Sequence, residues 1–156
     1  MTDLIEIRID SRALEAALDQ LARATANLTP LMRSLGAELV DLTEGRFEAE
    51  GPGWPDLAEA TKQRRAKSGH WPGKMLQVSG QLAASITTEV GPSSVLVGSA
   101  KKYAAIHQLG GQAGRGHTVI IPPRPYLPVN EDGSLFPDAE SAMVDVVLDY
   151  LHDAMA

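Results

Sequence analysis

The sequence predicts an α+β fold, a single domain of residues 1–156 in which helices pack on a small antiparallel β-sheet and flexible loops join the elements. Leucines recur at helical spacing near both ends of the chain. In the middle, short runs of β-branched residues are separated by turn residues, which is typical of hairpins. Strands that follow one another without intervening helices favour antiparallel pairing. A length of 156 residues fits one domain with its own core.

The first segments are a predicted strand and a predicted helix. Residues 5–9 alternate isoleucine with charged residues, which indicates a strand with one buried face. Asp10 or Ser11 is expected to cap a helix whose leucines share one face. These leucines are Leu14, Leu18 and Leu21.

A second helix is predicted from Thr29, which we expect at the N-cap with Pro30 in the first helical position. The helix is expected to end near residues 51–53, where glycine and proline stop it. The side chains predicted to line one side of it are Leu31, Leu35, Leu39, Leu42 and Phe47.

The central segment is rich in glycine and proline and holds both tryptophans. Residues 58–66 are predicted to form a short helix, and residues 68–73 an exposed loop. Ser79 is expected to cap a short helix that carries Leu82. The basic cluster of this region is Lys62, Arg64, Arg65 and Lys67.

Strands are predicted over residues 86–90 and 95–98, joined by a turn at 91–94. A short helix is expected over 101–109, and residues 110–116, with four glycines, are expected to form a mobile loop. Residues 118–121 indicate another strand, stopped by prolines.

The last predicted element is an amphipathic helix from Asp138 to the end of the chain. Its apolar side is predicted to consist of Met143, Val144, Val147, Leu148 and Leu151.

Composition excludes several classes of function. A net charge of -6 and a pI of about 5.1 argue against a nucleic-acid-binding protein driven by phosphate contacts. Without cysteine, neither a disulfide framework nor a thiolate metal site is expected. We expect no membrane span, because the apolar runs are too short, and no secretory signal in residues 1–7. No cofactor is expected.

His107 is the candidate catalytic residue. A general base needs a group that orients it and a group whose proton it removes, and no nucleophile motif accompanies this histidine. The preferred interpretation is that His107 and Gln108 hydrogen-bond to backbone near a tight turn at Gly110 and Gly111. The alternative function is a small hydrolase that uses His107 as its general base.

Metal and phosphate sites are not expected. The histidines lack the close spacing of metal ligands; they are His70, His107, His117 and His152. The glycine-rich residues 110–116 lead into a predicted strand rather than the helix N-terminus that would bind a phosphate. The segment around Gly73 and Lys74 has Met75 where a phosphate loop needs serine or threonine.

Two further features leave alternatives open. The basic cluster predicts a solvated helix face or a patch that pairs with an acidic neighbouring subunit, in preference to a phosphate contact. Trp54 and Trp71 are each expected either to cover the core or to anchor an interface.

Four segments in order resemble the phage virion morphogenesis family, the tail-completion proteins of Mu-like and P2-like phages. The first runs from Arg46-Phe47 to the Gly-Trp-Pro-Asp-Leu of residues 53–57 and Thr61. The second is residues 76–86, LQVSGQLAASI. The third is YAAIHQLGG at 103–111, and the fourth is IPPRPYL at 121–127.

The resemblance implies a non-enzymatic, structural virion protein that completes the tail and allows it to join the head. It implies a homo-oligomeric ring, with six as the expected number of subunits, that contacts the tail tube, terminator or neck proteins. DNA would pass through its channel without sequence-specific binding. The net charge of -6 separately suggests the hypothesis of an acidic lumen that repels phosphate. The expected location is the virion, with assembly in the host cytoplasm.

In such a protein the histidine and the arginine are structural. Arg124 lies between prolines on a stiff, extended segment, from which its guanidinium can cap carbonyls or hold a carboxylate of a neighbouring subunit. The residues expected to serve structure or interface are Trp54, Tyr103, His107, Gln108, Gly110, Gly111, Arg124, Pro125 and Tyr126.

Overall fold

The computed structural model describes residues 11–51 and 53–156. Five α-helices, two short 3₁₀ helices and four strands make up this part of the chain, which confirms the α+β class. In order, the elements are α1 (Arg12–Ala26), α2 (Thr29–Glu48), α3 (Glu59–Lys67), η1 (Ala83–Ser85), β1 (Ile86–Val90), β2 (Val95–Ser99), α4 (Ala104–Leu109), β3 (Gly111–Ala113), η2 (Arg115–His117), β4 (Val119–Ile121) and α5 (Pro137–Met155). The strand predicted at residues 5–9 lies outside the described residues.

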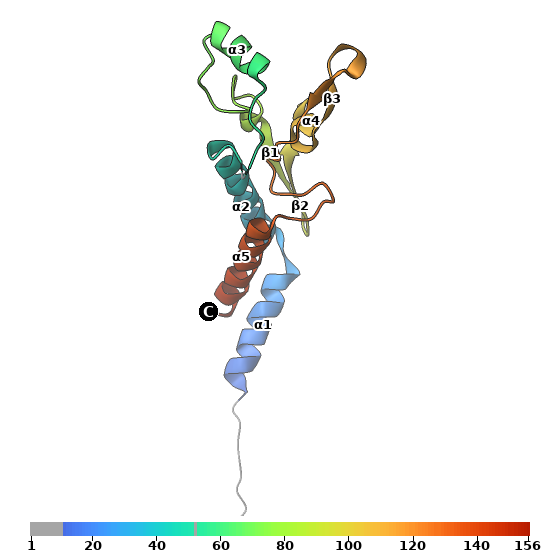
Figure 1. Cartoon of the computed structure of the whole chain (residues 1–156). Helices are drawn as coiled ribbons and strands as arrows, with labels where there is room; N and C mark the ends of the chain where they lie inside the picture. Colours follow the sequence, from blue (N-terminus) through green and yellow to red (C-terminus); the bar gives the residue numbers. More distant parts are fainter. Residues whose placement is uncertain (1–10, 52) are drawn as a thin grey trace, which may run out of the picture.

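The molecule is elongated (Figure 1). Helices α1, α2 and α5 occupy one end, where α5 packs against both α1 and α2. Helix α3 and the β3–β4 hairpin project side by side at the opposite end. The Tyr150 hydroxyl of α5 donates to the Ala24 carbonyl at 3.0 Å and thereby ties α5 to α1.

The sheet is divided into two antiparallel pairs, β1–β2 and β3–β4. In β1–β2, Ile86 lies opposite Ser99 and Val90 opposite Val95, as predicted for a hairpin with its turn at 91–94. Helix α2 packs on this pair. At Gly36 of α2 an added Cβ would lie 2.8 Å from Thr88 Cγ2, so only glycine allows this approach.

The buried core lies at the junction of the two ends. It consists of Phe47, Trp54, Leu82, Ala104 and Tyr126. These residues come from five separate segments, so the core fixes the position of α4 and the 122–129 segment relative to α2. Helix α2 otherwise follows the prediction, with Leu31 and Phe47 buried and the intervening leucines half-buried.

Three predicted helix starts are wrong. Thr29 is the first helical residue rather than the N-cap; Leu28 takes that position, and Asn27 Oδ1 accepts from the Thr29 amide at 3.1 Å. Ser79 caps no helix, because the helical turn is a three-residue 3₁₀ helix with Leu82 at its N-cap. The helix expected from residue 101 begins only at Ala104.

Two other expectations need correction. Residues 110–116 are not an irregular loop, because Gly111–Ala113 pair with Val119–Ile121 and form an arm. Helix α5 does not bury its whole apolar side: Val144 and Leu148 are 51% and 57% exposed, and only Ala139 is buried. Helix α5 packs against α1 and α2, and these two side chains keep about half of their surface exposed.

Candidate functional site

A proline-rich strap, residues 122–129, is held between α4 and residues 54–57. Its central residue is Arg124, only 5% exposed. Arg124 Nε donates to the Pro55 carbonyl and Nη2 to the Asp56 carbonyl, both at 2.9 Å. Of the two roles considered for this guanidinium, the structure has it capping carbonyls. Burial lowers the pKa of Arg124 and the nearby Arg65 lowers it further, while Asp56 raises it.

Gln108 of α4 binds the other half of the strap. Its Oε1 accepts from the Tyr126 amide at 3.0 Å and from the Leu127 amide at 2.9 Å. Its Nε2 donates to the carbonyls of Leu127 and Val129 at 3.3 and 3.2 Å. The nearly buried side-chain amide of Gln108 thus forms hydrogen bonds with two amides and two carbonyls of the strap, a segment that belongs to neither β-sheet.

The aromatic residues of the site are part of the core. Trp54 Nε1 donates to the Pro125 carbonyl at 3.1 Å, and its ring meets Phe47 edge-on with centroids 6.2 Å apart. Tyr126 is 2% exposed, stacks on Phe47 at 5.2 Å and donates through its hydroxyl to the Ala104 carbonyl at 3.2 Å. Trp54 therefore covers the core, whereas Trp71 is half-buried near the Lys62 ammonium, 5.5 Å from its ring centroid.

Gly110 ends α4 and brings the strap close. Its φ is 74°, in the left-handed region that favours glycine. An added Cβ would lie 2.9 Å from both Cδ and N of Pro123. Gly111 then begins β3 opposite Ile121. The glycines therefore let the chain reverse against the strap.

His107 lies beneath this turn. Its carbonyl accepts from the Arg124 amide at 2.8 Å, and its ring meets Tyr103, 40% exposed, edge-on at 5.9 Å. Burial lowers the pKa of His107, and the positive charge of Arg124 lowers it further; both effects favour the neutral imidazole. Nδ1 is buried and has no hydrogen-bond partner within the described part of the chain. The oriented carboxylate that the hydrolase alternative requires is therefore not found at Nδ1 among these residues.

Within residues 11–51 and 53–156, no group of three or more histidine, aspartate or glutamate side chains is placed to hold a metal ion. None of the helices described there has both the length and the apolar character needed to cross a bilayer.

The strap forms the floor of an open cavity of about 640 Å³ between α3 and β4, which we call the fork cavity. Its basic lining residues are Arg64, Arg65 and Arg124. Its apolar lining residues are Leu57, Ala58, Leu76, Val78, Val119, Ile120, Ile121 and Pro122. Asp56, Thr61, Ser68 and His107 complete the lining.

Sequence reasoning missed a second buried arginine contact. Arg46, 5% exposed, donates from Nη2 to both carboxylate oxygens of Asp138, at 3.1 and 2.9 Å, and its guanidinium carbon lies 4.5 Å from the centroid of the Phe136 ring. The contact joins the end of α2 to the first turn of α5, where a carboxylate also favours the helix dipole. The only sequence signal for this contact was the position of Arg46, a charged residue next to Phe47 on the predicted apolar side of the helix.

Comparison with known proteins points to the same family as the four sequence segments. The model of the phage virion morphogenesis family matches residues 9–152. The Mu-like prophage FluMu G protein 2 of Haemophilus influenzae is 38% identical over 149 residues, 94% of this chain and 96% of that protein. The putative capsid assembly protein G of Escherichia phage Mu is 35% identical over 135 residues, 83% of this chain and 86% of that protein. No solved structure shows significant similarity.

Proposed function

Because this chain belongs to the phage virion morphogenesis family, we propose that its structural role in assembly is to complete the tail of a tailed phage or prophage so that the tail joins the head. The observation that carries the proposal is what the polar side chains of the family-like segments bind. Gln108 and Arg124 bind the chain's own backbone, and the half-buried His107 accepts a hydrogen bond from the Arg124 amide through its carbonyl. These groups build a rigid support and leave the outer surfaces for contacts.

The proposed assembly is a homo-oligomeric ring of six subunits around the DNA channel. Its support is the exposure of large apolar side chains at both ends of the elongated molecule. Leu14 and Leu18 on α1 are 62% and 55% exposed, and Ile120 on β4 is 76% exposed. Subunit contacts would remove such surface from water.

In this assembly the ring contacts the tail tube, terminator or neck proteins, and DNA passes without sequence-specific binding. The net charge of -6 supports a channel that repels phosphate. The protein would be assembled in the host cytoplasm and remain in the virion.

Deletion of the gene tests the proposal. Electron microscopy of the lysates should show filled heads and separate tails, and plaque formation should return when the wild-type chain is supplied from a plasmid. The Mu relative is named for capsid assembly, and that role predicts a different result, namely missing or malformed heads. Malformed heads with normal tails, or normal infectious particles, would refute tail completion.

A further inference from the structure

The fork cavity has a surplus of positive charge. Arg64 and Arg65 form no ion pair with any residue in the described ranges. Arg65 donates to the Lys74 carbonyl at 3.1 Å, which leaves its charge uncompensated. The only acidic lining residue, Asp56, is paired with Lys62. Around these charges the walls are mainly apolar, so the cavity suits an occupant that is both apolar and acidic.

Helix α5 carries a surface with those properties. Its exposed side chains Val144 and Leu148 form an apolar stripe one turn apart. Asp145 and Asp149 are exposed directly beside the stripe. The helix holds five acidic residues and no lysine or arginine. The stripe therefore complements the fork cavity in both polarity and charge.

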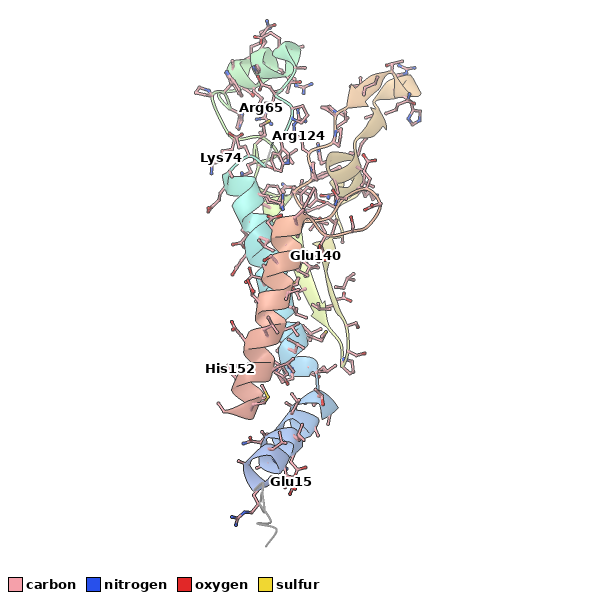
Figure 2. The ribbon with its side chains drawn as sticks, turned by 60° about the horizontal axis from the view of Figure 1, so that its bottom comes forward. Glu15, Arg65, Lys74, Arg124, Glu140 and His152 are labelled. Atoms are coloured by element: carbon pink, nitrogen blue, oxygen red, sulfur yellow. The ribbon has the colours of Figure 1, made fainter. Side chains whose placement is uncertain are left out.

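A chain cannot fill its own cavity with this stripe. Helix α5 packs on α1 and α2, at the opposite end of the molecule from α3. In Figure 2, Arg65 and Arg124 lie near the fork, whereas His152 lies toward the far end of α5. The occupant must come from another molecule.

The exposed stripe of α1 fits the cavity less well. Leu14 and Leu18 are exposed to a similar extent as the stripe of α5, but the helix around them carries charges of both signs, including Glu15, Asp19 and Arg23. It offers no surplus of negative charge to the arginines, so α5 is the better match.

We propose that the fork cavity of one subunit binds the Val144–Leu148 stripe of α5 from the next subunit. The contact is head-to-tail, and repetition of such a contact closes into a ring or continues as a filament. The inference rests on the proposed ring and names the surfaces that form it. Burial of the stripe removes apolar side chains from water, and the aspartates next to it face Arg64 and Arg65 of the neighbour.

Disulfide cross-linking tests the contact cleanly, because the chain has no cysteine. The variant Ile120→Cys/Leu148→Cys places one thiol on each proposed surface. In lysates of deletion-phage infections supplied with this chain, mild oxidation should give a ladder of cross-linked oligomers. Either single-cysteine variant should give none. The companion pair Val119→Cys/Val144→Cys covers a shift of one helical turn in register.

Two results would overturn the interface. One is the absence of a ladder from both double variants; the other is a dimer from Leu148→Cys alone, which would place two α5 helices together. Plaque formation by the reduced variants is scored in the same cultures. If plaques form without a ladder, the interface is wrong while the proposed function stands; if deletion itself leaves plaques, the function fails.

Charge exchange gives a second, independent measurement. In the double-cysteine background, Arg64→Glu or Asp149→Lys should each reduce cross-linking at least about tenfold, since like charges then face each other. Combining the two changes should restore the yield. Arg115→Glu, on the exposed η2 turn outside the cavity, is the matched control and should leave the yield unchanged. Equal yields from all four variants would overturn the proposed pairing.

Discussion

Replacement of Gln108 by alanine should destabilise the fold more than its size suggests. The change removes the acceptor for two strap amides, Tyr126 N at 3.0 Å and Leu127 N at 2.9 Å. Each buried donor left without a partner costs about 1–3 kcal/mol. The two carbonyl contacts, at 3.3 and 3.2 Å, are longer and contribute less. We expect the free energy of unfolding to fall by about 2–6 kcal/mol, a large part of the total for a domain of this size.

Urea denaturation followed by circular dichroism measures this loss. Gln112→Ala is the matched control, because Gln112 is the same residue type at an exposed position of β3. A difference between the two variants below about 0.5 kcal/mol, the usual effect of a surface substitution, would refute the claim that Gln108 holds the strap.

Gln108→Glu separates hydrogen bonding from volume. Glutamate keeps an acceptor for both amides but places a second oxygen against two carbonyl oxygens. At pH 7 it should destabilise the fold at least as much as alanine, because the charge is nearly buried and unpaired. Stability relative to wild type should recover at low pH, where the carboxyl group takes up a proton and can donate again. Wild-type stability at pH 7 in the Gln108→Glu variant would contradict the observed bonding pattern.

Three further substitutions test the same region by urea denaturation. Arg124→Lys should lower the free energy of unfolding by about 1–3 kcal/mol, because one ammonium cannot reproduce the two directed N–H groups that a guanidinium offers to two carbonyls. Arg115→Lys on the surface should leave the free energy of unfolding unchanged. Gly110→Ala should lower the free energy of unfolding more than Gly69→Ala. Both glycines have left-handed φ values, 74° and 73°, but only a Cβ at residue 110 would meet Pro123, at 2.9 Å; equal losses would place the whole cost in the backbone conformation. The lowered pKa of His107 means that the unfolded chain takes up a proton below about pH 6.5 while the folded chain does not, so stability falls on acidification through that range. His107→Gln should flatten this slope by up to about 1.4 kcal/mol per pH unit, and an unchanged slope would refute the assignment.

Periodic patterns predicted most of the regular structure. The stripe that ends at Phe47 located α2 to within a few residues at each end, and the β-branched runs on either side of residues 91–94 predicted the β1–β2 hairpin. The strand predicted at residues 118–121 is confirmed as β4, but its partner β3 was missed because β3 is three residues long and begins with a glycine that the turn requires. So short a segment has no periodicity to read, and glycine is more common in loops.

The sequence predicted which residues form the candidate site but not what they contact. The resemblance grouped His107 and Gln108 with Arg124, and the structure brings the three together. The acceptors of Arg124 could not be predicted, because they are backbone carbonyls 68 and 69 residues away. A carbonyl group is present at every residue, so nothing in the sequence marks the one that will be capped. The Arg46–Asp138 pair, 92 residues apart, was missed for a related reason: either partner could equally have been a surface charge.

The buried arginines and the exposed arginine of the fork cavity should respond differently to substitution. Arg46 and Arg124 are each 5% exposed and bind groups within the chain. Arg64 lines the fork cavity and is exposed. Arg124→Lys should therefore lower the free energy of unfolding, while molecules that remain folded cross-link normally through the cysteines. Arg64→Glu should do the reverse, with normal unfolding and weak cross-linking. If both variants changed both measurements alike, the support formed by the strap and the surface formed by the fork could not be separate parts of the molecule.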